Sequence, residues 1–364
     1  MKDILPELNG KEYIQALNQD YDIRFCNIDE VDQLIAFLKE NWKENHIFVL
    51  DRKLFDWQHL NKKEHRYNYV LAKSRVTGEI HSVLGFVPTN QFDSAIEESY
   101  EVWPCIWKSR DDVHIKGLGV SLYYYLKENL PIETISILGI SEVALSIYKH
   151  WNFSTGKVKQ FYIPNSEMRK FFLMENVPLE QIVDKQTNIY FNECDEDDFK
   201  NNMEIASLEI NKYKSLKFYI NRYYKHPTYK YTAYKIIKQG KIKLVLFTRE
   251  NFAENSKCIR IVDYVGNIKE IEGSYSAVQK LLHKNNYEYL DFVNVGISKE
   301  LLTGAGFLDR DDSNVIIPNY FEPYLKENIS LDYAFKTVSD STEGIFVKGD
   351  SDQDRPNVTM SRKE

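Results

Sequence analysis

The residues whose types and spacing could do chemistry lie together in segment 114–121, where Lys116 stands beside Gly117 and Gly119. Glycine has no Cβ, so a ligand can approach the backbone closely, and the first-turn amides of a helix have no partners within that helix. Such amides, with the charge of Lys116 beside them, suit an anion such as phosphate. A tight loop before a core helix would contain the same residues, so this segment alone leaves both interpretations open.

The elements expected after the glycines are a helix, a strand and a second helix. Over 118–126 apolar residues recur at the spacing of one helical face, which predicts a helix. The apolar run 133–140 predicts a buried strand. Ser141 has the side chain of a helix N-cap and precedes a short helix predicted over 142–150.

The chain before the glycines alternates in the manner of strands. We expect a first strand over 22–27, an amphipathic helix over 28–42, and a hairpin of strands 69–74 and 80–87. After residue 42 the chain is interpreted as a charged, aromatic connection through Asp56-Trp57-Gln58-His59. A strand over 103–108 leads into the glycine loop, and Pro104 restricts it to a strand start, an edge or a bulge.

This order of elements resembles the core of the GNAT acyltransferase superfamily. The family loop reads roughly Gln/Arg-x-x-Gly-x-Gly/Ala and binds the pyrophosphate of coenzyme A; here it is His-Ile-Lys-Gly-Leu-Gly-Val-Ser, with Lys116 for the usual arginine and Ser at the last small position. The resemblance implies coenzyme A, as acyl-CoA, for the co-substrate. It places that molecule against Ile106, Trp107, Lys108, Lys116, Gly117, Leu118, Gly119, Val120 and Ser121.

A second family motif follows in the right order and at the right separation. The pattern Asn-x-x-Ala-x-x-Leu-Tyr-x-x-x-Gly-Phe compares with residues 141–153 of this chain. Ala144, Tyr148 and Phe153 keep the register, whereas Ser141 and Asn152 depart from it. The specific motifs lie within 70–165, although the resemblance covers about the whole chain.

The resemblance implies direct attack of an amine on the thioester, without an acyl-enzyme. Tyr148 matches the family tyrosine that protonates the leaving thiolate, and a backbone amide near Ile106 would polarise the carbonyl. For the general base, Glu101 is the first candidate, with His114 and Asp93 as alternatives; a water relay needs none of them. The cysteines give no support for a nucleophilic mechanism, because none has a fixed histidine partner in the sequence.

Residues for the acceptor are expected before the loop and near the end of the chain. Phe92 and Trp103 offer ring faces for a base or sugar, with Asp93 beside them, although core packing is the commoner role of such rings. For the polar run 350–357 a solvated tail is the favoured interpretation. The alternative folds it over a polar ligand, with Arg355 toward phosphate.

The second half of the chain repeats the first. Gly-Ile-Ser at 139–141 recurs at 296–298, and Ile-Pro-Asn at 163–165 recurs at 317–319. A hairpin, a strand over 258–262, a helix over 277–283 and a strand over 289–297 follow the order of the first half. The glycine loop does not recur, so the second copy is expected to have lost coenzyme A binding.

We therefore expect an α/β (α+β) fold with two GNAT-like domains, each a mixed, mostly antiparallel twisted sheet flanked by helices. The expected division is an acyl-CoA-binding domain over 1–165, a helix-containing connection over 166–190, a degenerate domain forming the acceptor cleft over 191–336, and a polar tail over 337–364.

Composition narrows the classes of partner. Lys and Arg number 47 against 54 Asp and Glu, a net charge of −7, which argues against nucleic-acid binding. The four cysteines form no Cys-x-x-Cys pair, so reduced thiols and no metal site are expected. No N-terminal apolar segment has the length of a signal peptide or membrane span, which predicts a cytoplasmic protein. We expect a monomer or homodimer.

Large duplicated chains of this kind resemble bacterial acyltransferases that modify nucleotide-linked amino sugars for O-antigen or capsule. The predicted activity is transfer from acetyl-CoA or 3-hydroxybutyryl-CoA to the amine of a dTDP- or UDP-linked amino-deoxysugar. The first alternative is a Fem-type peptidoglycan aminoacyltransferase, a family that typically inserts a long helical hairpin. The second is a catalytically silent GNAT-like pair that binds a ligand or a partner protein.

Overall fold

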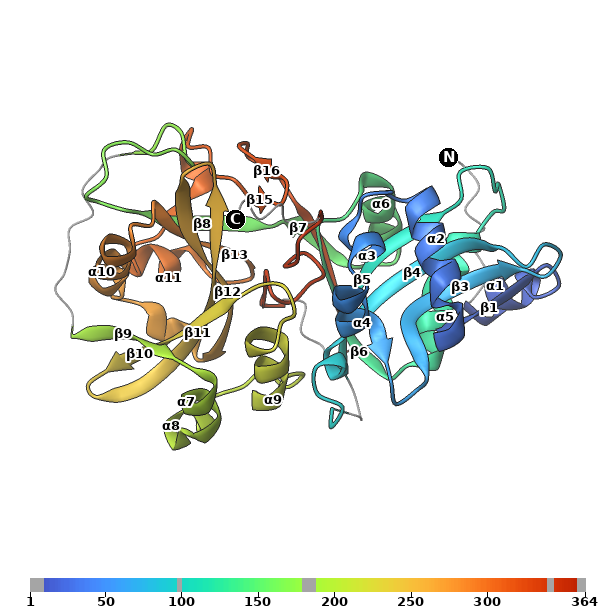
Figure 1. Ribbon diagram of the computed structural model, residues 1–364, viewed down its shortest axis with the longest axis horizontal. Helices are drawn as coiled ribbons and strands as arrows, with labels where there is room; N and C mark the ends of the chain where they lie inside the picture. Colours follow the sequence, from blue (N-terminus) through green and yellow to red (C-terminus); the bar gives the residue numbers. More distant parts are fainter. Residues whose placement is uncertain (1–9, 97–99, 179–187, 339–343, 359–364) are drawn as a thin grey trace. The chain divides into compact units, whose positions relative to one another are not determined.

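The structure, a computed structural model, describes residues 10–96, 100–178, 188–338 and 344–358 (Figure 1). The chain forms two compact units, residues 1–137 with 356–364 and residues 138–355. Among the residues described, no helix combines the length and the apolar character needed to cross a membrane.

The first unit is built on a twisted sheet with the strand order β1-β3-β4-β5-β6. All neighbours are antiparallel except β5 and β6, which run parallel. Gly78, with φ of +71°, makes the turn of the expected hairpin between β3 and β4. The strands are β1 (Tyr21–Asn27), β2 (Leu60–Asn61, paired with β3), β3 (Arg66–Ser74), β4 (Ile80–Pro88), β5 (Tyr100–Ser109) and β6 (Ile132–Leu138).

Helices cover both faces of this sheet. Alternate residues of β3 and β4, such as Tyr69 and Val83, join the apolar faces of α2, α3 and α4 in one core cluster. On the other face, Tyr125 of α5 packs its ring 5.3 Å from Phe25 of β1. The helical elements are α1 (Gly10–Leu17), η1 (Ile28–Glu30), α2 (Val31–Asn41), α3 (Ile47–Leu50), α4 (Arg52–His59), η2 (Thr89–Gln91) and α5 (Leu118–Asn129).

The interpretation of the chain after residue 42, through Asp56–His59, as a plain connection is wrong, because α3 and α4 form within it. The Asp51 carboxylate caps α4 by accepting from the Leu54 amide at 3.0 Å. Phe48 and Phe55 are fully buried and anchor the two helices on the sheet.

The second unit contains a longer sheet with the order β14-β8-β13-β12-β11-β10-β9. Among the described strands of this sheet only β12 and β13 run parallel, and β18 pairs with β13. The strands are β8 (Lys159–Pro164), β9 (Ile189–Cys194), β10 (Tyr231–Lys238), β11 (Lys241–Ala253), β12 (Ser256–Gly266), β13 (Tyr289–Val295), β14 (Leu308–Asp309) and β18 (Phe346–Val347). In the same unit, β7 (Ser154–Lys157) pairs with β17 (Asp332–Thr337), and β15 (Tyr320–Phe321) with β16 (Tyr324–Leu325).

Helices also cover both faces of the second sheet (Figure 1). α10 and α11 pack on one face through a core cluster that includes Val278 and Leu302. On the other face, Tyr219 and Tyr223 stack on Phe247 of β11 with ring centroids 5.3 Å and 4.7 Å away. The helical elements are α6 (Glu142–His150), α7 (Glu196–Asn201), α8 (Met203–Ala206), α9 (Leu216–Tyr219), η3 (Ile220–Tyr224), η4 (Ile268–Ile271), α10 (Tyr275–Asn285), α11 (Lys299–Gly304) and η5 (Arg310–Asp312).

The repeat read from the sequence is also a repeat of backbone conformation. Gly139 and Gly296 both have positive φ, of 75° and 83°, and the serines two residues later both cap a helix. At the far ends of those helices, Asn152 and Gly306 both adopt positive φ, 56° and 91°. Asparagine tolerates this left-handed conformation better than most residues, which explains its presence where the family motif has glycine.

The two compact units are divided between residues 137 and 138 and between residues 355 and 356. β7 and β8, which precede residue 165, pair with β17 and with β13 and β14 inside the second compact unit. The helix expected over 166–190 is absent from 166–178 and 188–190, and residues 179–187 lie outside the described part. The expected domain boundaries after residues 165, 190 and 336 therefore stay a prediction.

The favoured interpretation of 350–357 as a solvated run is wrong for residues 350–355. The Gly349 amide donates to the Val262 carbonyl at 2.8 Å, which ties the segment to β12. Further along, the Asp354 carboxylate accepts from Arg249 at 3.1 Å and from the Tyr231 hydroxyl at 2.7 Å. These partners come from distant strands, so the local acidic composition gave no sign of them.

Candidate functional site

The glycine loop has the geometry of an anion-binding helix start. Gly117 is the N-cap of α5 and has φ of +79°, a left-handed conformation that favours glycine. The Ser121 amide makes the first bond of the helix, to the Gly117 carbonyl at 2.9 Å. The amides of Gly119 and Val120 precede that bond, so they have no partner four residues back within the helix. They can donate to a phosphate oxygen.

The side chains around this loop divide into exposed and buried groups. Lys116 and His114 are exposed, and Lys116 adds a positive charge at the loop. Ser121 is fully buried, and its hydroxyl donates to the Leu118 carbonyl at 2.7 Å. Because its hydroxyl is bonded within the helix, Ser121 is expected to keep the first turn compact rather than to contact a ligand.

Strand β5 carries a bulge beside the loop. Leu84 pairs with Trp107 and Phe86 pairs with Pro104, so Gly85 stands opposite two residues, Cys105 and Ile106. Bulges re-aim side chains and occur beside active sites. Pro104 flanks the bulge, as its missing N–H led us to expect.

The parallel pairing of β5 with β6 is short. It runs from Tyr100 to Val102 on β5, and the later β5 residues have no partner on β6 in the register of the two strands. The strands thus separate beyond Val102, where the predicted acyl-CoA contacts Ile106, Trp107 and Lys108 lie. The Lys108 ammonium pairs with Asp111, and Ile106 belongs to the core cluster under α2 to α4.

Glu101, the first candidate for the base, lies at the end of this short pairing. Its side chain is 4% exposed, and the Ser136 hydroxyl of β6 donates to it. Glu101 is opposite Thr134 in the register, so it belongs to the region where β5 and β6 begin to separate. The position suits a base that meets substrate only within a closed site.

The predicted acceptor residues of the first unit are buried. Phe92 is 3% exposed and packs its ring 5.0 Å from that of Trp57, and Trp103 is fully buried. The Asp93 carboxylate accepts from the Ala95 amide at 3.1 Å, which shapes a local turn. These contacts favour the core-packing interpretation, the alternative weighed for the two rings.

Tyr148 and Arg355 belong to the second unit. Tyr148 lies on α6, which packs on β7 and β17, and its ring is 4.9 Å from that of Phe153. Arg355 forms a two-point bond with the Asp352 carboxylate, at 2.9 Å and 2.7 Å. An anion would therefore compete with Asp352 for Arg355.

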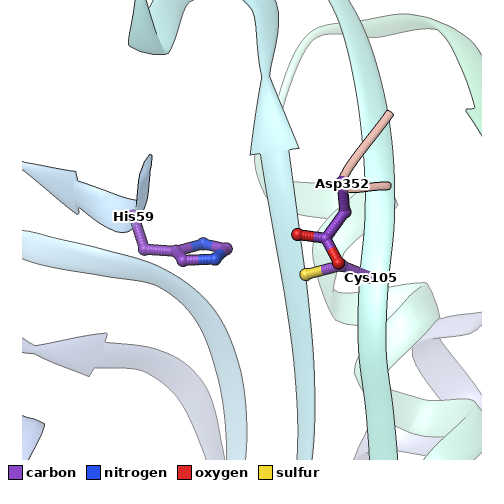
Figure 2. A group of neighbouring side chains, drawn as sticks. All are labelled: His59, Cys105 and Asp352. Carbon is purple, nitrogen blue, oxygen red and sulfur yellow. The ribbon is translucent and has the colours of Figure 1, made fainter. Parts of the chain in front are cut away.

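Sequence reasoning missed a cysteine–histidine pair in the first unit. A ring nitrogen of His59, at the end of α4, lies within 4.8 Å of the Cys105 sulfur at the β5 bulge. Figure 2 shows the imidazole directed toward the thiol; the third side chain drawn there, Asp352, belongs to the second unit. Only a tertiary fold could reveal this pair, because α4 and β5 are far apart in the sequence.

No protein-family model matches the chain, and no curated protein matches its sequence. Solved structures do match. A GCN5-related N-acetyltransferase from Anabaena variabilis ATCC 29413 aligns with a TM-score of 0.52 and 10% identity, over 88% of this chain and 74% of that chain. A conserved protein of unknown function from Enterococcus faecalis V583 aligns with a TM-score of 0.51 and 9% identity, over the same shares.

A third similarity is weaker and supports no inference. N-myristoyltransferase from Saccharomyces cerevisiae, solved with bound myristoyl-CoA, aligns with a TM-score of 0.42 and 11% identity, over 93% of this chain and 82% of that chain.

Proposed function

We propose that this chain is an acyltransferase, and the two structural matches with TM-scores above one half support the fold class that such an enzyme needs. The chain has a mixed α/β fold with two mostly antiparallel sheets flanked by helices, like the GNAT-type N-acetyltransferase among its structural neighbours. At 10% and 9% sequence identity, the similarity to these two structures shows the fold alone.

We propose that the chain is a GNAT-type N-acyltransferase that takes its acyl group from acyl-CoA. The observation that carries the proposal is the start of α5, where Gly117 has a left-handed backbone and the Gly119 and Val120 amides have no helical partner. Lys116 adds its charge at that point. The separation of β5 from β6 supports the same proposal, because it leaves β5 backbone groups for the extended arm of the donor.

The proposed acceptor is the amine of a dTDP- or UDP-linked amino-deoxysugar of bacterial O-antigen or capsule synthesis. This finer part rests on the resemblance of the duplicated chain to sugar acyltransferases. The amine attacks the thioester carbonyl directly, with Glu101 or a water as base, and Tyr148 protonates the leaving thiolate. An amide near Ile106 stabilises the oxyanion.

The experiment that tests this function measures thiol release from acetyl-CoA and 3-hydroxybutyryl-CoA, each with a panel of dTDP- and UDP-amino sugars. We expect release that depends on one nucleotide sugar. Tyr148→Phe should lower the rate about 100-fold or more, as expected for loss of a general acid, while its ring keeps the contact with Phe153. Tyr190→Phe, an exposed tyrosine, is the matched control.

The other outcomes separate the alternatives. Coenzyme A binding without release for any sugar would move the proposal to another amine acceptor. No coenzyme A binding, or binding that survives Gly119→Glu, would overturn the enzyme proposal and favour the silent pair. A Fem-type transferase is less favoured, because α5, at 12 residues, is the longest α-helix in the described part.

A further inference from the structure

Both copies of the repeat contain a fork between two parallel strands. In the first copy, β5 and β6 pair as far as Val102 and Ile135. In the second copy, β12 and β13 pair as far as Ile261 and Phe292. Ile135 and Phe292 both lie four residues before the glycine of a Gly-Ile-Ser sequence, so the two pairs of strands separate at equivalent positions. We call the space beyond Ile261 and Phe292 the second fork.

The C-terminal segment of the chain itself lies in the second fork. β18 pairs antiparallel with the end of β13. The Lys348 amide then donates to the Val293 carbonyl of β13 at 3.2 Å. The next amide, of Gly349, donates to the Val262 carbonyl of β12 at 2.8 Å. Val262 and Val293 directly follow the last strand pair, so two successive amides of the segment bridge the strands where these begin to separate.

Glycines allow the segment to approach both strands closely. A Cβ added to Gly349 would overlap the Tyr223 hydroxyl and lie 2.7 Å from the Val262 carbonyl oxygen. At the end of β13, a Cβ added to Gly296 would overlap the Gly344 carbonyl oxygen. A side chain at either position would therefore push the segment out of the second fork.

Buried ion pairs hold the segment beyond the fork. The Lys214 ammonium lies 2.5 Å from a carboxylate oxygen of Asp350 and 2.8 Å from one of Asp263 on β12. Arg249 of β11 pairs with Asp354 at 3.1 Å. All five residues are less than a tenth exposed. Separating such pairs would leave uncompensated charges in the interior, so the segment is firmly held.

We infer that residues 346–349 are an internal ligand of the second copy. They lie between its separated strands, at the position where the first copy is proposed to hold the extended arm of acyl-CoA. The inference rests on the proposed function for the identity of that arm. The missing glycine loop removes only contacts to the pyrophosphate, whereas the segment also fills the place of the arm. The chain therefore has one donor site, because its own backbone amides occupy the other.

Hydrogen exchange on the full-length protein, with and without saturating acetyl-CoA, tests the inference. The Lys348 and Gly349 amides should exchange about 100-fold or more slowly than in a free peptide of residues 344–355, and acetyl-CoA should leave their rates unchanged. Exchange as fast as in the free peptide would overturn the inference. So would protection that is lost when acetyl-CoA is added, because the donor would then displace the segment.

A calorimetric titration counts the donor sites. The native protein should bind one equivalent of coenzyme A. Two equivalents would mean that the second fork also accepts the donor, which overturns the inference and leaves the proposed function standing. Absence of coenzyme A binding, with the Lys348 and Gly349 amides still protected, overturns the proposed function and leaves the segment as the occupant of the second fork.

Gly349→Ala tests the close approach directly. It should displace the segment and speed exchange at residues 346–351 by about tenfold or more relative to the paired residues 259–261 of β12. Gly240→Ala is the matched control in the same unit, since φ there is +76° and an added Cβ meets nothing within 4 Å. It should strain its turn and leave the relative exchange of the segment unchanged. Unchanged relative exchange in Gly349→Ala would overturn the inference; should that variant not fold, the exchange of the native protein decides.

Discussion

The indole N–H of Trp107 on β5 donates to the carbonyl oxygen of Gly119 in the first turn of α5, across 3.0 Å. A Cβ on residue 119 would lie 3.2 Å from that indole nitrogen, so the glycine permits the approach. Sequence resemblance assigned Trp107 to the cofactor. Its side chain fixes the strand to the loop, and its part in cofactor binding stays a prediction.

Replacing Trp107 with phenylalanine tests this link. Losing one partly buried hydrogen bond should lower the free energy of unfolding by about 0.5–1.5 kcal/mol. Coenzyme A affinity, measured by calorimetry, should weaken severalfold because the first turn of α5 is less firmly held. Trp42→Phe alters a tryptophan that is 40% exposed and directly follows α2, and it should change neither quantity. If Trp107→Phe binds coenzyme A with unchanged affinity, the hydrogen bond from Trp107 to the loop does not contribute to ligand binding.

Gly117→Ala tests the left-handed N-cap. Alanine at φ of +79° should cost about 1–2 kcal/mol of stability and should weaken coenzyme A binding, because relaxation of the cap re-aims the amides. Gly78→Ala is the matched control, since φ there is +71° and an added Cβ meets nothing within 4 Å. We expect a similar loss of stability in both variants by chemical denaturation, and a loss of affinity in Gly117→Ala only. Equal affinities would argue against an anion site at this helix.

Local pattern was enough to predict several elements of the fold. The helix expected over 142–150 is α6, at Glu142–His150, because Ser141 and the apolar spacing mark its start and its inward face. The hairpin of β3 and β4 was likewise evident from alternation and the turn at Gly78. These features depend on neighbours a few residues apart, which a single sequence displays.

Contacts between distant segments could not be predicted in this way. The bond from Ser136 to Glu101 needs the parallel register of β5 and β6, and the approach of His59 to Cys105 needs both α4 and a bulge. From the sequence alone Asp354 is predicted to be solvated. In the fold, Tyr231 of β10 and Arg249 of β11 donate to its carboxylate. In each case the deciding partner is brought in by tertiary structure.

Asp354→Asn tests the buried pair that holds the end of the chain. Arg249 is 6% exposed, so without Asp354 its charge is left uncompensated, at a cost of about 3–5 kcal/mol. Burial alone would raise the pKa of Asp354, but the Arg249 charge and the Tyr231 hydrogen bond outweigh it and lower that pKa. The stability from this carboxylate is thus present above its unfolded pKa of about 3.9 and is lost as pH falls through the lower folded value.

Urea unfolding of Asp354→Asn and the native protein over a pH series measures this effect. The difference in the free energy of unfolding between the native protein and Asp354→Asn should be largest near neutral pH and should decrease in acid. Asp111→Asn, at an exposed aspartate, provides the control. If that difference in the free energy of unfolding stays constant down to strongly acid pH, the charge of the carboxylate does not stabilise the fold.

Lys348, in the same segment, makes the stability of the fold depend on pH in the neutral to alkaline range. It is 1% exposed, and its ammonium nitrogen lies 3.3 Å from the Asn319 side-chain oxygen. Burial lowers its pKa to about 7, and the nearby Arg260 charge acts in the same direction. Between that value and about 10.4, the unfolded chain binds a proton that the folded chain does not, so stability rises with pH.

Lys348→Met should remove this rise. The free energy of unfolding of the native protein should climb more steeply than that of the variant between about pH 7 and pH 10, by up to about 1.4 kcal/mol per pH unit. The variant should also be the more stable of the two below about pH 7, where the native protein keeps a buried charge. Lys127→Met, on the exposed side of α5, should leave the profile unchanged. Parallel profiles for Lys348→Met and the native protein would mean that Lys348 is protonated throughout, which requires the interior around β18 to admit water.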